Sequence, residues 1–382
     1  MRRFLALALL LGTASPGGAE PANTPPYASM RILQALQEQV AHGNSTAQLA
    51  QPKLMEHIAE QFLAADPAVW KEPRNARAAV LYLLSGGPPS AIRTITARTE
   101  FPADIKPLLV GALAYAEGQD EVARGLLDPI EPQSLPTALG SHLALIKAGL
   151  VSDRDPARAA TLFDTARLLA PGTLIEEAAL RREVFLLIDS GTIDKAMLLA
   201  RQYVRRFARS AYSGDFRQRF ANAAASMATA SDMGRLSKLD TVLNELPGSE
   251  TRSFYLDLAR ASVLGGKMAA ARFAADKAIG LCGPTSAEAQ RARLYRAAAL
   301  VVSDDGTEGL AALAALHGTN FSGDDQKLRD AALAIGTAIQ ADSIGNLGTD
   351  PGALAGNPAQ ATIDRARTAL QESDHLLQKA PE

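Results

Sequence analysis

The sequence predicts an all-α fold built from stacked helix pairs, and three observations support that prediction. Hydrophobic residues make up 47% of the 382 residues but aromatic residues only 5%, so Ala and Leu supply much of the apolar content. These two residues favour helices, whereas strands favour β-branched and aromatic side chains. Apolar positions recur at helical spacing from about residue 30 to residue 340, with short Gly, Pro or Asp breaks. The helical pattern also repeats along the chain, as solenoid proteins do.

The first nineteen residues have the pattern of a secretory signal peptide. Arg2 and Arg3 begin it, an apolar run follows over residues 4–11, and small residues at 17–19 suit a signal peptidase. The run is too short to span a bilayer, although an uncleaved anchor is the alternative interpretation. We expect residues 1–19 to be removed, no membrane span in the mature protein, and a location in the periplasm.

Several prolines over residues 20–29 predict a short tether before the first helix, which is expected to begin near Met30. The predicted solenoid covers residues 30–344. Gly and Pro then recur over residues 345–359, which predicts a flexible linker. Residues 360–382 resume helical spacing and are expected to form a C-terminal helix and tail. This helix is expected to cap the stack, because an open solenoid end exposes apolar surface, although docking elsewhere is the alternative.

The clearest repeat places small and bulky residues at fixed offsets. Ala159, Phe163, Ala166 and Pro171 match the second helix of a tetratricopeptide-type repeat, with a small residue, an aromatic residue, a small residue and a helix-ending proline. Alanine lets two helices approach, phenylalanine fills the groove between them, and proline ends the helix.

Similar units follow and precede this one. Comparable small and aromatic positions lie over residues 196–203 and 271–278, and weaker pairs are separated by breaks at residues 86–87, 118 and 304–306. One pair cannot bury its apolar face alone, so neighbouring pairs must stack. The sequence therefore predicts a right-handed superhelix of tetratricopeptide-like helix pairs, an α-solenoid. The alternative is an irregular all-helical domain with coincidental spacing.

The residues that could carry catalysis are not arranged for it. The five histidines are scattered without metal-ligand spacing, and neither a phosphate-binding glycine loop nor a Gly-x-Ser-x-Gly elbow occurs in the sequence. The pair Glu176-Glu177 follows Pro171-Gly172, where carboxylates stabilise the positive end of a helix. The single cysteine, Cys282, excludes an intramolecular disulfide, and its apolar neighbours predict a buried side chain. We expect a non-enzymatic protein without a cofactor or a small-molecule substrate.

Four arginines are the candidate partner-binding residues. Arg201, Arg205 and Arg209 recur every four residues, so we expect them to form one stripe on a helix predicted over residues 193–207, and Arg206 flanks them. Such a stripe can dock an acidic segment of a protein partner. The alternative, which is more frequent for charge runs, is a solvated face with arginines favourably placed near the helix C-terminus. A formal net charge of -2 argues against nucleic acid as a partner.

Several stretches resemble the MotC family of flagellar motor proteins. They are residues 27–37, residues 72–76 (EPRNA) leading into residues 82–87 (YLLSGG), and residues 164–173 (DTARLLAPGT) followed by residues 176–182 (EEAALRR). The likeness extends from about residue 27 to residue 300 and fades in the Gly-rich C-terminal part. It implies a periplasmic protein required for flagellar rotation, whose partner is the periplasmic part of the stator protein MotB.

Two other functions remain open. The first is an exported tetratricopeptide-like adaptor or chaperone of envelope assembly that is unrelated to motility. The second is an envelope glycan-cleaving enzyme with a helical superhelix, as in some lytic transglycosylases. Such enzymes also carry a lysozyme-like catalytic domain, for which we expect no room after the predicted solenoid.

Overall fold

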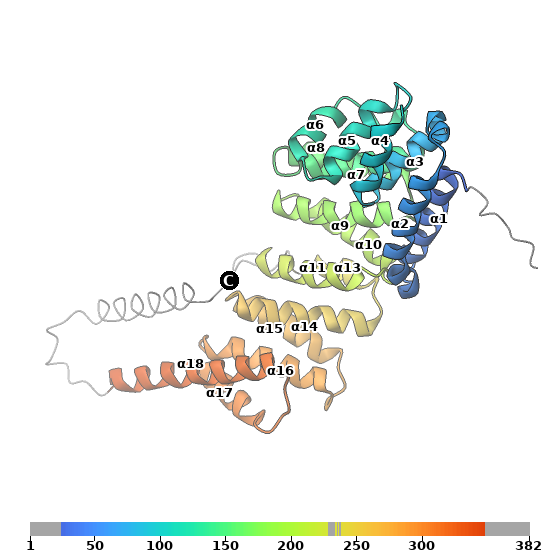
Figure 1. The fold of residues 1–382 in the computed structure, drawn as a ribbon. Helices are drawn as coiled ribbons and strands as arrows, with labels where there is room; N and C mark the ends of the chain where they lie inside the picture. Colours follow the sequence, from blue (N-terminus) through green and yellow to red (C-terminus); the bar gives the residue numbers. More distant parts are fainter. Residues whose placement is uncertain (1–23, 228–233, 235, 237, 348–382) are drawn as a thin grey trace, which may run out of the picture. The chain divides into compact units, whose positions relative to one another are not determined.

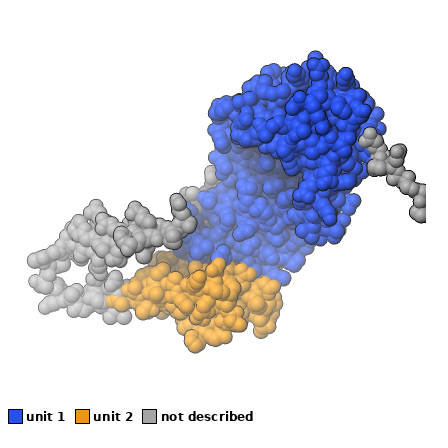
Figure 2. Space-filling model, viewed as in Figure 1, with its two compact units in different colours: residues 1–270 blue, residues 271–382 orange. Residues whose placement is uncertain are grey.

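The computed structural model describes residues 24–227, 234, 236 and 238–347. These residues form helices joined by short turns, and no strand occurs among them. The predicted signal peptide (1–19) and C-terminal helix and tail (360–382) lie outside the described residues. The chain divides into two compact units, Met1–Ala270 and Ala271–Glu382 (Figure 2). Within the described part of the chain, no helix is both long and apolar enough to cross a membrane.

Unit 1 is built from consecutive helices that pack on one another (Figure 1). Their bounds are α1 (Pro26–Ala41), α2 (Ser45–Ala64), α3 (Pro73–Leu84), α4 (Pro89–Arg98), α5 (Lys106–Ala116), α6 (Asp120–Leu127), α7 (Thr137–Val151), α8 (Pro156–Leu169), α9 (Leu174–Asp189), α10 (Ile193–Phe207), α11 (Ser213–Met227), α13 (Leu239–Leu243) and α14 (Gly248–Leu264). Short 3-10 turns, η1 (Pro67–Lys71) and η2 (Pro132–Ser134), precede α3 and α7. The prediction of an all-helical chain of helix pairs is confirmed.

The repeat positions predicted from the sequence lie in the core of unit 1. Ala159, Phe163 and Ala166 on α8 are at most 2% exposed, and Ala196, Ala200 and Tyr203 on α10 are at most 1% exposed. The small residues occupy the places where α8 meets α7 and α9, and where α10 meets α9. Their spacing therefore reports helix packing, as the sequence predicted.

The first helix departs from simple stacking of neighbours. In addition to α2, α1 packs on α3 and on α9, which is far from it in sequence (Figure 1). It begins at Pro26, so the tether predicted over residues 20–29 is too long. The physical reason is that proline suits the first turn of a helix, where a backbone N–H has no partner in any case.

Unit 2 contains most of α15 (Met268–Gly280), followed by α16 (Ala287–Val301), α17 (Gly306–Ala315) and α18 (Gly323–Leu347). Ala271, Ala275 and Ala278 are fully buried, as the repeat predicted. Cys282, expected to be buried, is only half-buried. Because α18 continues to Leu347, the first residues of the predicted linker (345–359) are helical.

Candidate functional site

The helix that carries the predicted arginine stripe is α10, whose bounds agree with the prediction. Arg201, Arg205 and Arg206 are exposed on it, opposite the buried side chains of Tyr203 and Phe207. Arg209 is also exposed but lies beyond the end of the helix, in the turn before α11. The four arginines are therefore neighbours, although they do not form one continuous helical stripe.

Two of the four arginines have partners within unit 1. The Arg201 guanidinium donates to Glu245 Oε1 from Nε at 2.7 Å and from Nη2 at 2.5 Å, which ties α10 to the segment after α13. Arg206 Nη2 lies 3.0 Å from Oε2 of the buried Glu176 on α9. These contacts give Arg201 and Arg206 a structural role.

Arg205 and Arg209 form no ion pair among the described residues. The backbone of Arg209 is nevertheless held in place, because it packs on the turn between α1 and α2. A Cβ atom at Gly43 would lie 2.1 Å from the carbonyl oxygen of Arg209, and Gly43 has a φ of +89°. Only glycine satisfies both constraints at this position. The turn after α10 thus holds Arg209 beside the N-terminal hairpin, while Arg205 lies in the last turn of α10 itself.

Three carboxylates on α9 are buried, and the sequence indicated only part of their role. Glu176 Oε2 accepts from the Gly172 N–H at 2.5 Å, in keeping with the predicted helix start, while its Oε1 accepts from Gln202 at 3.1 Å. Glu177 Oε1 accepts from the Tyr203 hydroxyl at 2.7 Å. Burial raises the pKa of Glu177. Both glutamates therefore also fasten α9 to α10, which no local sequence pattern could indicate.

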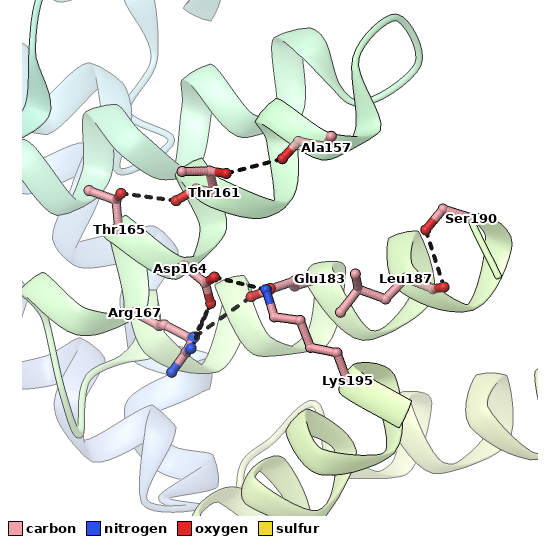
Figure 3. A network of polar contacts seen from close by, with 9 residues as sticks. All are labelled: Ala157, Thr161, Asp164, Thr165, Arg167, Glu183, Leu187, Ser190 and Lys195. Atoms are coloured by element: carbon pink, nitrogen blue, oxygen red, sulfur yellow. Dashed lines mark hydrogen bonds and ion pairs between the residues drawn. The ribbon is translucent and has the colours of Figure 1, made fainter. Parts of the chain in front are cut away.

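The third carboxylate, Glu183, belongs to a four-residue charge cluster (Figure 3). Lys195 Nζ lies 2.7 Å from Glu183 Oε1 and 2.8 Å from Asp164 Oδ2. Arg167 donates to Asp164 from Nε at 2.9 Å and lies 3.7 Å from Glu183. Burial raises the pKa of Glu183 to about 7, although Lys195 opposes the shift. The two carboxylates and the two cations balance each other, so the cluster has no need of an external ion. Its members come from α8, α9 and α10, and their contacts join these three helices.

A crevice opens in unit 1 between α1, the start of α7 and the turn from α8 to α9. Its larger cavity has a volume of about 390 Å³, and a second cavity of about 200 Å³ shares Gln37, His142, Leu174 and Ile175 as walls. The other wall residues of the larger cavity are Gln34, Glu38, Thr137, Ala138, Ser141, Leu169, Ala170, Pro171 and Thr173. No sequence pattern pointed to this crevice, because its walls come from segments far apart in the chain.

His142 lines both cavities and is held as a neutral ring. Its Nδ1 lies 2.7 Å from the Ala138 carbonyl oxygen, and its Nε2 lies 3.3 Å from the Ser85 hydroxyl. Nδ1 therefore donates, and Nε2 accepts from Ser85. Burial lowers the pKa of His142 to about 4. Among the residues that the structure describes, no group of three or more His, Cys, Asp or Glu side chains is placed to hold a metal ion.

Comparison with known proteins gives one family and one close sequence relative. The family model described as "Chemotaxis protein MotC" matches residues 1–382. The chemotaxis protein MotC of Rhizobium meliloti (strain 1021) is 32% identical over 374 residues, which is 97% of this chain and 82% of that protein. The crystal structure of the P58(IPK) TPR domain covers 82% of this chain and 99% of its own, at 14% identity and a TM-score of 0.24. That score is too low to bear on the fold, which rests on the helix pairs themselves.

Proposed function

Because the chain belongs to the MotC family, a family of chemotaxis proteins with a motility-related role, we propose that it acts in the periplasm as a non-enzymatic part of the flagellar motor. Its proposed partner is the periplasmic part of the stator protein MotB, which it would hold in place so that proton flow is coupled to torque. The family match along the whole chain is the observation that carries this proposal. The signal-peptide pattern of residues 1–19 supports the location.

The surface of unit 1 supports binding of a protein. Its helices are joined by short turns and their apolar faces are buried, so the exposed faces are available to a partner. Arg205 and Arg209 are two exposed cations without ion pairs among the described residues. We assign them to an acidic segment of the partner, because complementary charges steer association and select the partner.

A deletion strain tests the motor assignment. We expect cells without this protein to build flagella but to fail to swim, and a plasmid copy of the chain to restore swimming. We also expect the purified chain to capture the purified periplasmic part of MotB. Normal swimming of the deletion strain would contradict the proposal and leave the envelope adaptor as the remaining function.

Reversing the charge at both free arginines tests the assigned contact. Arg205→Glu together with Arg209→Glu is expected to weaken capture of the periplasmic part of MotB by about tenfold, mainly through slower association. The control variant, Lys71→Glu together with Lys106→Glu, makes the same change of charge at two exposed positions, the end of η1 and the start of α5. It is expected to leave capture unchanged. Equal weakening in both double variants would show that only net charge matters.

A further inference from the structure

Helix α18 in unit 2 extends beyond the helices that cover it. It packs on α16 and α17, and Ala332 and Gly336 are buried four residues apart on one side of it. A Cβ atom at Gly336 would lie 2.5 Å from the Leu310 side chain of α17, so the contact is tight there. Every side chain from residue 337 to residue 341 is exposed, although the helix continues to Leu347. The cover that α16 and α17 provide therefore ends near Gly336.

A second side of α18 is apolar and exposed. Ala331, Ile335 and Ala338 recur at offsets of four and three residues, so they share a face that differs from the buried one. The side chain of Ile335 is 50% exposed, and that of Ile339 beside it is 45% exposed. A surface helix normally has one apolar stripe, which faces its core. A second stripe on the same helix therefore indicates a second helix as neighbour.

The last turns of α18 lack the packing that usually stabilises a helix. An isolated helix shorter than about 12–15 residues is marginal in water, and residues 337–347 are shorter than that. Helices in proteins gain most of their stability from packing of an apolar face. Because the cover of α16 and α17 ends near Gly336, we expect another segment to pack on this end of α18.

The chain itself supplies a matching segment. Ile363, Ala366, Leu370 and Leu377 recur at offsets of three, four and seven residues, so in a helix they form one apolar stripe. Residues 348–359 connect this segment to α18, and antiparallel helices need a connection of only about 2–5 residues. A short flexible linker gives the attached segment an effective concentration on the order of millimolar. This attachment favours the segment over a second copy of the chain or a separate protein.

We propose that residues 360–378 fold back along α18 as an antiparallel helix whose apolar stripe covers Ala331, Ile335 and Ala338. The two alanines let the helices approach closely, and Ile335 fills the groove between them. The contact closes the end of the helix stack in unit 2, where apolar surface would otherwise remain open to water. It lies within one chain, so it does not depend on the motor assignment.

Hydrogen exchange of the full chain, followed by mass spectrometry, tests the contact in both directions. We expect the amides of residues 337–347 and 363–377 to be protected in the wild type. Leu370→Asp places a charge in the contact and should speed exchange of residues 337–347 by about tenfold, while Ile335→Asp should do the same for residues 363–377. Unprotected amides over residues 363–377, or a change confined to the substituted segment, would overturn the proposal.

Two matched variants control for the added charge. Leu376→Asp makes the same substitution as Leu370→Asp but lies off the apolar stripe of its segment, and Thr337→Asp changes an exposed residue on another face of α18. Each should leave the exchange rate of the opposite segment unchanged. Faster exchange of the opposite segment in these controls as well would show that the added charge acts without a specific contact, and would overturn the proposal.

Dilution identifies what covers α18. A contact within one chain gives the same protection at every protein concentration. Protection of residues 337–347 that falls on dilution would show that a second copy of the chain covers them. Protection that appears only after the purified periplasmic part of MotB is added would show that this partner covers them. Either result would overturn the proposal, and neither would contradict the proposed function.

Discussion

At the scale of single residues, Glu183 has the most consequential environment in unit 1. Its carboxylate is fully buried, and the loss of water raises its pKa to about 7 although Lys195 and Arg167 face it. The folded-state pKa therefore lies above the unfolded value of 4.5. The unfolded chain releases this proton first, so the group's contribution to stability decreases as the pH rises from about 4.5 to about 7.

Replacing this carboxyl group by an amide should remove that pH dependence. We compare the free energy of unfolding of the Glu183→Gln variant with that of the wild type at each pH. This difference should shift in favour of the variant by about 2 kcal/mol from pH 5 to pH 8. Urea unfolding of both proteins at the two pH values measures the difference. Parallel stability curves would mean that Glu183 is ionised throughout this range.

At the scale of helices, the alanines at helix crossings set how closely the pairs approach. Ala159 is fully buried on α8 where α8 meets its neighbours, whereas Ala157 on the same helix is exposed. Enlarging a side chain in a close-packed interior forces neighbouring helices apart.

Ala159→Leu should therefore destabilise unit 1 by about 1–3 kcal/mol, while Ala157→Leu should change stability by less than about 0.5 kcal/mol. Denaturant unfolding followed by circular dichroism measures both variants. An equal effect at the two positions would refute the assignment of Ala159 to a tight crossing.

The same helices show which features could be predicted from the sequence and which could not. The bounds of α10 and the buried positions of the repeats follow from local spacing, so they were predictable. The ion pair between Arg201 and Glu245 and the packing of α1 on α9 join distant segments, and no periodicity reports such contacts. Among the described residues, only two of the four predicted arginines therefore lack an ion pair, and the crevice was not foreseen.

At the scale of the whole molecule, unit 1 brings two turns that are distant in sequence together, since Gly43 packs against the backbone of Arg209. Gly43→Ala places a Cβ atom against the Arg209 backbone and also strains a positive φ angle. Gly118 has a φ of +73° but open space around its missing Cβ, so Gly118→Ala experiences only the strain.

We expect Gly43→Ala to cost about 1–3 kcal/mol more than Gly118→Ala, because the first must also displace packed backbone. It should also weaken capture of the periplasmic part of MotB, since it shifts the turn that carries Arg209. Calorimetry and the capture assay measure the two effects. Equal destabilisation by both alanines would mean that the two turns are not tightly joined.

The packing of α1 on α9 has a consequence for the order in which the protein matures. A chain synthesised from its N-terminus presents α1 long before α9 has emerged, so this helix lacks one of its partners until then. Contacts between distant segments also slow folding, because a long loop must close before they form. Protease cleavage near Met30 during synthesis should therefore be easy at first and cease only once residue 189 has emerged.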